Sequence, residues 1–246
     1  MKCGVLMKGD AAVAIIPARY HSTRFPGKPI AEIQGKPLIE YVYRQVQKAR
    51  LVARIAVATD DPRIADAVKR FGGTAIMTRS DHPSGTDRLA EAVHGLSEDT
   101  LIANVQGDEP MIDPGDIDRA IAAARPRDAE MVTLMTKIGT AEVADPNRVK
   151  VVTDRNGMAL YFSRSKIPSR GTCFLHVGLY VYSAGFLKTF TKLERTRLEL
   201  AEGLEQLRAL EHGYRIRVVE VESESWGIDT PADLERFKEI FGRTNG

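Results

Sequence analysis

The sequence predicts an α/β protein with a mostly parallel, twisted sheet flanked by helices and an inserted hairpin subregion. Short β-branched apolar runs alternate with segments of helical spacing through the first half of the 246-residue chain. That order is typical of a parallel sheet, because the crossover helices then cover its faces. After residue 149 the pattern changes to two short apolar strands around a turn.

Each element of the first half has its own signal. Pro37 lies in the first turn of a predicted helix, a position that proline favours. Asp60-Asp61-Pro62 predicts a helix start, and Gly72-Gly73 a helix end. We expect strands at residues 13–16, 55–59, 74–77 and 101–105, and helices at 37–46, 62–71, 86–94 and 116–124.

In the second half, Asp154-Arg155-Asn156-Gly157 joins two apolar runs and predicts a hairpin. We further expect a strand at 176–182, one long helix near 198–212, a strand at 216–221 and a closing helix at 231–241. No repeat or flexible linker interrupts the chain. We therefore predict one domain over residues 1–246, with residues 1–11 as a frayed leader and about 149–182 as the hairpin subregion.

Composition argues against several classes of protein. A net charge of +2 is too small for a nucleic-acid coat or a membrane-surface protein. No apolar stretch approaches the roughly 20 residues of a membrane span. Cys3 and Cys173 are the only cysteines, which argues against a disulfide framework and fits a reducing cytoplasm.

A basic loop follows the first predicted strand. Residues 17–29 read PARYHSTRFPGKP and hold Arg19, Arg24 and Lys28 without an acidic residue. Arginine and lysine suit phosphate, and loops after parallel strands are where α/β sheets bind ligands. Neither the P-loop nor the dinucleotide pattern is present. The loop is thus either a triphosphate site or a solvated basic surface.

Two aspartates stand at the ends of other predicted elements. Asp108 follows the fourth strand, and Asp229 precedes the last helix. Carboxylates distant in sequence can meet at one edge of a sheet and hold Mg²⁺ together with phosphate oxygens. The alternatives are a turn residue for Asp108 and a helix cap for Asp229, since Asp-Thr-Pro is a good helix start.

The remaining polar candidates are ambiguous by themselves. Gln106 can donate and accept hydrogen bonds, as base recognition requires, or it is a polar residue at a strand end. Ser84 and Gly85 form a ligand-contacting loop or only a turn. Arg164 ends an apolar strand, where a buried arginine needs an anion. His176 alone fits a structural histidine, and Glu205 a solvated helix residue.

Seven further motifs accompany the opening one, Pro17-Ala18-Arg19-x-x-Ser22-x-Arg24-x-Pro26-Gly27-Lys28-Pro29. They are Ala58-Thr59-Asp60, residues 77–82 (MTRSDH), 84–88 (SGTDR), 104–110 (NVQGDEP), 161–164 (YFSR), 205–208 (EQLR) and 227–231 (GIDTP). Together they resemble the sugar-activating cytidylyltransferases, most of all the 3-deoxy-manno-octulosonate (Kdo) branch. The opening motif alone is shared with sialic-acid cytidylyltransferases, and the later set is more specific. Residues 165–175 depart from the pattern, with a loop shorter than is usual, and Trp226 is unusual there.

The resemblance implies a Rossmann-like, nucleotide-diphospho-sugar transferase-like fold and a cytoplasmic homodimer, with the hairpin as its dimerisation region. The implied reaction joins CTP and Kdo into CMP-Kdo and pyrophosphate for lipopolysaccharide biosynthesis, with Mg²⁺ as cofactor. It implies neither a nucleic-acid nor a membrane partner. The alternatives are another acidic sugar, 8-amino-Kdo or a sialic acid, or a non-catalytic nucleotide-binding protein.

The resemblance also assigns residues to roles. It places Ala18, Arg19, Arg24, Lys28, Ser84, Gly85 and Gln106 around the nucleotide and Arg164, His176, Tyr180, Glu205 and Gln206 around the sugar. Asp108 and Asp229 match the metal ligands, and these two with Arg19 and Lys28 form the implied catalytic set.

Overall fold

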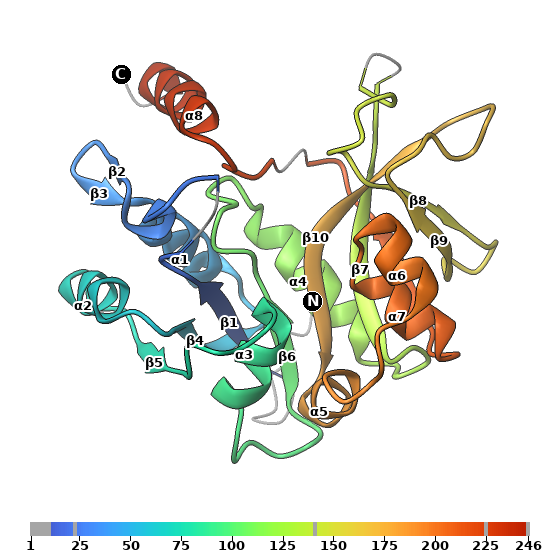
Figure 1. Ribbon diagram of the computed structural model, residues 1–246, viewed down its shortest axis with the longest axis horizontal. Coiled ribbons are helices and arrows are strands. Elements are labelled where there is room, and N and C mark those ends of the chain that lie inside the picture. Colours follow the sequence, from blue (N-terminus) through green and yellow to red (C-terminus); the bar gives the residue numbers. More distant parts are fainter. Residues whose placement is uncertain (1–10, 22–23, 140–141, 224–225, 245–246) are drawn as a thin grey trace, which may run out of the picture. The chain divides into compact units, whose positions relative to one another are not determined.

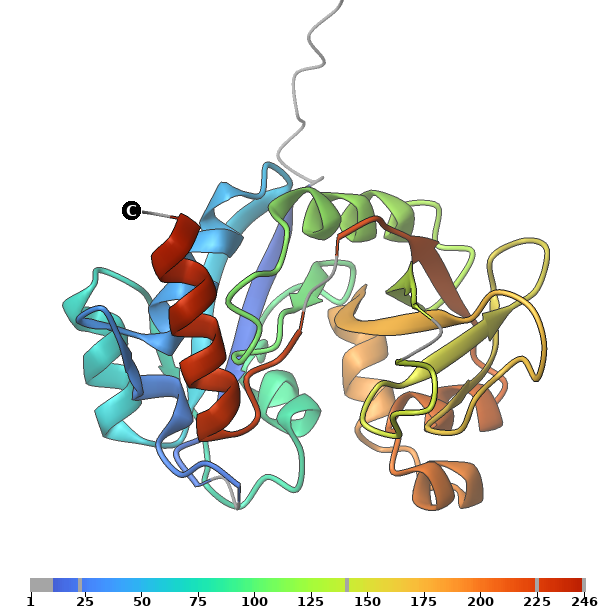
Figure 2. The same ribbon diagram turned by 90° about the horizontal axis from the view of Figure 1, so that it is seen from above.

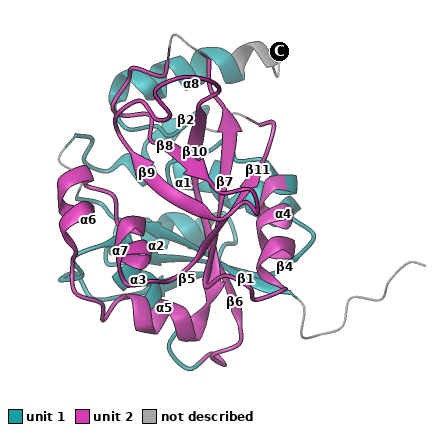
Figure 3. Cartoon of the chain, turned by 90° about the vertical axis from the view of Figure 1, so that its right-hand side faces the viewer, with its two compact units in different colours: residues 1–95, 104–115, 225–246 teal, residues 96–103, 116–224 magenta. Residues whose placement is uncertain are grey.

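The computed structural model describes residues 11–21, 24–139, 142–223 and 226–244 (Figure 1). The expected leader, residues 1–11, lies outside them except for its last residue. The chain divides into two compact units, coloured separately in Figure 3. Unit 1 comprises residues 1–95, 104–115 and 225–246, and unit 2 residues 96–103 and 116–224. Neither unit is a continuous stretch of sequence.

Unit 1 contains a parallel sheet in the order β1, β4, β5. Ala18 lies opposite Thr59, and Thr59 lies opposite Met77, so the carboxyl ends of the three strands are level. The loops that follow the strands therefore emerge at one edge. The elements are β1 (Ala12–Ala18), η1 (Lys28–Ile30), β2 (Glu32–Ile33), β3 (Lys36–Pro37), α1 (Leu38–Lys48), β4 (Val52–Thr59), α2 (Pro62–Arg70), β5 (Ala75–Met77), α3 (Gly85–Ala92) and α8 (Pro231–Thr244).

Local signals explain where the helices of unit 1 begin. The Asp61 side chain accepts a hydrogen bond from the Arg63 amide and caps α2, as the sequence predicts. Ser84 caps α3 in the same way. Helix α8 is held by a buried cluster that includes Ile33, Leu38 and Phe237, and Figures 1 and 2 both show it beside α1 and β2.

Unit 2 is built on a mixed sheet. β7 pairs in parallel with β11 and antiparallel with β10, and β10 continues antiparallel through β8 to β9. The predicted hairpin is thus confirmed as β8–β9. The elements of unit 2 are β7 (Met131–Lys137), β8 (Lys150–Thr153), β9 (Ala159–Ser163), β10 (Phe174–Ser183), α5 (Ala184–Phe190), α6 (Arg197–Glu202), α7 (Gln206–Glu211) and β11 (Ile216–Glu220). β6 (Leu101–Asn104) and α4 (Pro114–Ala124) begin in one unit and end in the other.

The α/β prediction is confirmed, but the prediction of one long helix over 198–212 is wrong. The chain there forms α6 and α7, separated at Gly203, which has a left-handed φ of 63°. Glycine adopts this conformation without steric cost and is a typical helix end. The sequence analysis also missed β7 and α5. β7 is almost fully buried, so its apolar run lacks the alternation of a half-exposed strand.

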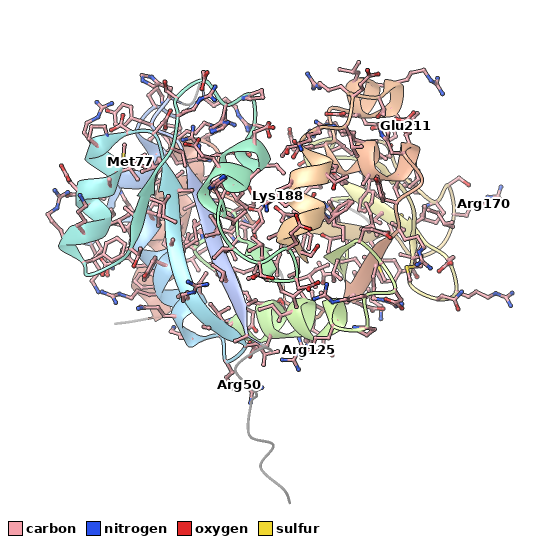
Figure 4. The ribbon with its side chains drawn as sticks, turned by 90° about the horizontal axis from the view of Figure 1, so that it is seen from below. Arg50, Met77, Arg125, Arg170, Lys188 and Glu211 are labelled. Atoms are coloured by element: carbon pink, nitrogen blue, oxygen red, sulfur yellow. The ribbon has the colours of Figure 1, made fainter. Side chains whose placement is uncertain are left out.

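Few large apolar side chains are exposed on the described residues. The exposed fractions are 61% for Leu160 on β9, 60% for Leu200 on α6 and 53% for Met77, which Figure 4 labels. Among the helices that the structure describes, none is both long and apolar enough to cross a membrane.

Candidate active site

The basic loop leaves β1 at the level edge of the unit 1 sheet and turns back on itself. The Gly27 amide donates to the Tyr20 carbonyl at 2.8 Å, which closes the loop. Gly27 has a φ of 71°, and a Cβ atom there would lie 3.3 Å from the Tyr20 ring. The glycine is therefore required both by its conformation and by the close packing. Arg19 is exposed directly after β1, and Lys28 starts η1.

The Tyr20 ring also contacts a cation, the guanidinium of Arg63. The Arg63 guanidinium lies 3.3 Å from the ring centroid, a cation–π contact between α2 and the loop. Arg63 is itself held by Asp61, with nitrogen–oxygen distances of 2.9 and 2.6 Å. These hydrogen bonds from Arg63 lower the pKa of the Asp61 carboxyl. Tyr20 thereby ties the basic loop to the start of α2, a contact that the sequence analysis missed.

Asp108 reaches the same edge because its segment runs beside β1. The Val105 amide donates to the Ile15 carbonyl at 3.1 Å. Two residues on, a Cβ atom at Gly107 would stand only 2.7 Å from the Pro17 carbonyl oxygen. Only glycine permits so close a backbone approach. The segment of Asp108 therefore lies at the edge of the sheet where the loop of Arg19 emerges.

Asp229 is brought to Asp108 by a backbone contact. The Ile228 amide donates to the Asp108 carbonyl at 2.9 Å. Gly227 lies so close that a Cβ there would be 3.9 Å from the Asp108 carboxyl carbon. Two carboxylates that are far apart in the sequence therefore meet within unit 1.

Basic side chains of the loop lie between these carboxylates. Lys28 Nζ is 2.6 Å from Asp108 Oδ2 and 3.5 Å from Asp229 Oδ1, and Arg24 is 3.0 Å from Asp229 Oδ1. The Lys28 side chain is only 14% exposed, whereas Arg24 is 59% exposed. Two cations and two carboxylates that the sequence analysis selected separately thus form one cluster.

The alternative reading of Asp229 as a helix cap is wrong. Helix α8 starts at Pro231, and Thr230 precedes it. Thr230 Oγ1 accepts from the Asp233 amide at 3.2 Å, and Asp233 Oδ2 accepts from the Thr230 amide at 2.8 Å. This is a capping box with aspartate in the place of glutamate. Burial raises the pKa of Asp233, but hydrogen bonds from Thr230 and the Asp229 amide outweigh it and leave the pKa lowered. The Asp229 carboxylate does not cap the helix and instead pairs with Lys28 and Arg24.

Two of the other residues assigned to the nucleotide, Ala18 and Gly85, lie beside Pro17 near the end of β1. Ala18 is the buried last residue of β1. A Cβ atom at Gly85 would lie 3.6 Å from the Pro17 ring, so the start of α3 also contacts this point. Gln106 follows β6 and its amide donates to Asn104 at 3.4 Å. The Ser84 hydroxyl is engaged with Asp87 at 2.7 Å, which gives Ser84 a structural role as the cap of α3.

The five residues assigned to the sugar all lie in unit 2. His176 and Tyr180 are on β10 with ring centroids 5.5 Å apart, and Thr133 Oγ1 is 2.9 Å from His176 Nε2. Burial lowers the pKa of His176 to about 3, so the ring is neutral at physiological pH. Glu205 and Gln206 begin α7.

The expectation that a buried Arg164 needs an anion is not met, because backbone carbonyls accept hydrogen bonds from its guanidinium. The side chain is half-buried. It donates to Glu202 at 2.8 Å, Pro146 at 3.1 Å and Gly203 at 3.5 Å. Carbonyl oxygens at a helix end can satisfy a guanidinium as an anion does.

The donor set at the edge of unit 1 fits a hard divalent cation. The described residues hold no group of three or more histidine, cysteine or acidic side chains suited to a metal. Asp108 and Asp229 offer two carboxylates, and both lie within reach of the one ammonium of Lys28. Magnesium is usually bound by one or two carboxylates together with substrate phosphates and water.

Comparison with known proteins places the chain in a family. The family model described as "Cytidylyltransferase" matches residues 13–216. The 3-deoxy-manno-octulosonate cytidylyltransferases of Trichlorobacter lovleyi and Geobacter sulfurreducens are 54% and 53% identical, each over 92% of this chain and 97% of the relative. A solved structure of CMP:2-keto-3-deoxy-manno-octonic acid synthetase complexed with CTP is 45% identical and covers 95% of this chain and 99% of its own, with a TM-score of 0.91. The chain belongs to the cytidylyltransferase family, in its 3-deoxy-manno-octulosonate branch.

Proposed function

We propose that this chain is a 3-deoxy-manno-octulosonate cytidylyltransferase, which converts CTP and Kdo into CMP-Kdo and pyrophosphate. The observation that carries the proposal is the meeting of Lys28 with Asp108 and Asp229 at 2.6 and 3.5 Å. A nucleotidyl transfer needs cations for the triphosphate and carboxylates for a metal at one point. The relatives named above carry this activity in their names, and the related structure holds CTP.

In this reaction the anomeric C2 hydroxyl of Kdo attacks the α-phosphorus of CTP. The new bond joins the C2 oxygen to that phosphorus, the bond to the bridging oxygen of the β-phosphate breaks, and the hydroxyl proton is released. Arg19, Arg24 and Lys28 bind the triphosphate and neutralise the charge that builds up on the leaving pyrophosphate. Positioning and charge stabilisation supply most of the rate, as in other phosphoryl-type transfers.

Asp108 and Asp229 are the residues that would hold Mg²⁺. When bound, the ion neutralises phosphate oxygens and lowers the cost of ionising the attacking hydroxyl. Lys28, which now pairs with both carboxylates, is then free to turn toward the phosphates. Its flexible stem suits such a change of partner.

The acceptor Kdo binds through residues of unit 2. His176 is neutral at physiological pH and serves as a hydrogen-bonding partner for sugar hydroxyls rather than as a cation. Tyr180, Glu205 and Gln206 supply further hydroxyl partners. Arg164 orients this region through its carbonyl contacts and faces the sugar carboxylate only after exchanging one of them.

We also propose a cytoplasmic homodimer. β9 pairs only with β8 among the described strands, and Leu160 on it is 61% exposed. An exposed apolar side chain on an edge strand is stabilised by a second chain. The chain has only two cysteines, which fits a reducing compartment.

The test is a side-by-side turnover assay with CTP and Mg²⁺. Kdo, 8-amino-Kdo and a sialic acid are compared as acceptors by pyrophosphate release. We expect Kdo to give the highest kcat/KM. A higher value for another acidic sugar moves the protein to the alternative activity, and no release with any of them favours a non-catalytic nucleotide-binding protein.

A further inference from the structure

One carboxylate in unit 2, that of Glu202, accepts hydrogen bonds from three residues on and directly after β9. It accepts from the Ser163 hydroxyl at 2.7 Å, from the Arg164 amide at 2.8 Å and from the Tyr161 hydroxyl at 3.3 Å. Tyr161 and Ser163 point to the same face of the strand, because side chains alternate along it. The last residue of α6 is therefore fixed to the end of β9.

The Arg164 side chain in turn donates to the backbone at the end of α6. Its guanidinium donates to the carbonyl of Glu202 at 2.8 Å and to that of Gly203 at 3.5 Å. These are terminal carbonyls of α6, which have no partner within the helix. Glu202 and Arg164 thus bind each other reciprocally, each through side chain and backbone.

The two helices are joined to each other by separate contacts. Arg208 of α7 forms a buried ion pair with Glu199 of α6 at 2.6 and 2.8 Å. Glu211 of α7, labelled in Figure 4, accepts from the Leu198 amide at 2.8 Å. The pair α6–α7 therefore holds together without Glu202, and the hydrogen bonds of Glu202 join the pair to β9.

The segment placed in this way carries two of the residues assigned to the acceptor. Glu205 and Gln206 come directly after the turn at Gly203, which has a φ of 63°. A shift of α6–α7 along β9 moves both side chains and leaves the nucleotide residues of unit 1 unchanged. Burial raises the pKa of Glu202, but the Arg164 amide and the Ser163 and Tyr161 hydroxyls outweigh it, so the pKa is lowered.

We propose that Glu202 is a positioning residue for the acceptor sugar, holding Glu205 and Gln206 in register with β9. The proposal rests on the proposed function, because it takes Glu205 and Gln206 as acceptor-binding residues. Glu202 itself does not touch the reacting atoms. Its removal is expected to weaken acceptor binding selectively, since misplacing a binding group by about 1 Å is costly.

The test measures KM for Kdo and for CTP in Glu202→Ala and Glu202→Gln. We expect Glu202→Ala to raise the KM for Kdo by about tenfold or more and to leave the KM for CTP within about twofold. Glu202→Gln restores most of the loss, because an amide oxygen still accepts from the Arg164 amide and the amide nitrogen donates to the hydroxyls. Glu194→Ala, at an exposed position before α6, is the matched control and is expected to leave both values unchanged.

A purely structural role for Glu202 predicts a lower melting temperature and less active protein, with an unchanged KM for Kdo in the folded fraction. That result overturns the proposal, as does an equal rise in both KM values. If Glu202→Ala does not fold, the double variant Tyr161→Phe/Ser163→Ala removes two of the three donors and is judged by the same two KM values. Wild-type protein without Kdo turnover instead refutes the proposed function, so the two failures are distinguishable.

Discussion

Replacing Asp229 by asparagine separates catalysis from stability. The Asp229 side chain is 46% exposed and pairs with Arg24 at 3.0 Å and Lys28 at 3.5 Å. Ion pairs this accessible contribute about 0–1 kcal/mol to the free energy of unfolding. A loss of that size lowers the melting temperature of a chain this long by no more than about 2–4 °C. Turnover, in contrast, should fall by about 10²–10³, the usual cost of removing one charge-stabilising group.

The assay is a Mg²⁺ titration of turnover. Asp229→Asn should need more Mg²⁺ for its half-maximal rate and have a lower rate at saturation, because a charged oxygen ligand is lost. Thr230→Ala gives the opposite pattern. It removes the observed cap of α8, so about 1 kcal/mol of stability is lost while the titration curve stays unchanged. An Asp229→Asn enzyme with normal turnover and an unchanged titration curve would refute the metal role of Asp229.

Four further outcomes are expected. Arg19→Ala should lower kcat by about 10²–10³ in a folded protein, and a loss below about threefold would remove Arg19 from the phosphate site. Gly107→Ala should destabilise the protein by about 1–3 kcal/mol in chemical denaturation, because its Cβ would stand 2.7 Å from the Pro17 carbonyl. His176→Gln should make the free energy of unfolding depend less on pH below 6.5. The native pKa of His176, about 3, lies below the unfolded value of 6.5, so the unfolded chain binds more protons between these pH values. Wild-type stability should then fall by up to about 1.4 kcal/mol per pH unit as the pH drops from 6.5 toward 3, and parallel curves for the two proteins would contradict the burial of a neutral ring. Light scattering at micromolar protein should give a dimer mass, and a monomer would reject the homodimer.

Much of unit 1 could be predicted from sequence because its signals are local. Apolar, often β-branched runs mark the strands, and side-chain caps at Asp61 and Ser84 mark the starts of α2 and α3. Fewer elements of the second half of the chain could be predicted. β7 is buried along most of its length and shows no alternation, and a single glycine at 203 was enough to break the expected long helix.

The candidate site, too, could be predicted only in part. Arg24, Lys28, Asp108 and Asp229 could be selected from the sequence, and the structure brings them together. Their contacts could not be predicted, because they depend on backbone pairing between distant segments such as Ile228 with Asp108. The pattern Thr230-x-x-Asp233 is a capping signal in the sequence, and it would have indicated that Thr230 rather than Asp229 caps α8. The expectation that Arg164 needs an anion was wrong, because sequence alone does not show that carbonyls satisfy its guanidinium.

The most direct test of the proposed site is a crystal structure with CTP and Mn²⁺ in place of Mg²⁺, with the metal located by its anomalous scattering. The proposed mechanism predicts one peak bonded to oxygens of both Asp108 and Asp229 and to the triphosphate, at about 2.0–2.2 Å, with Lys28 turned from the carboxylates to the phosphates. A metal bound to the triphosphate alone, with Lys28 still between Asp108 and Asp229, would contradict it.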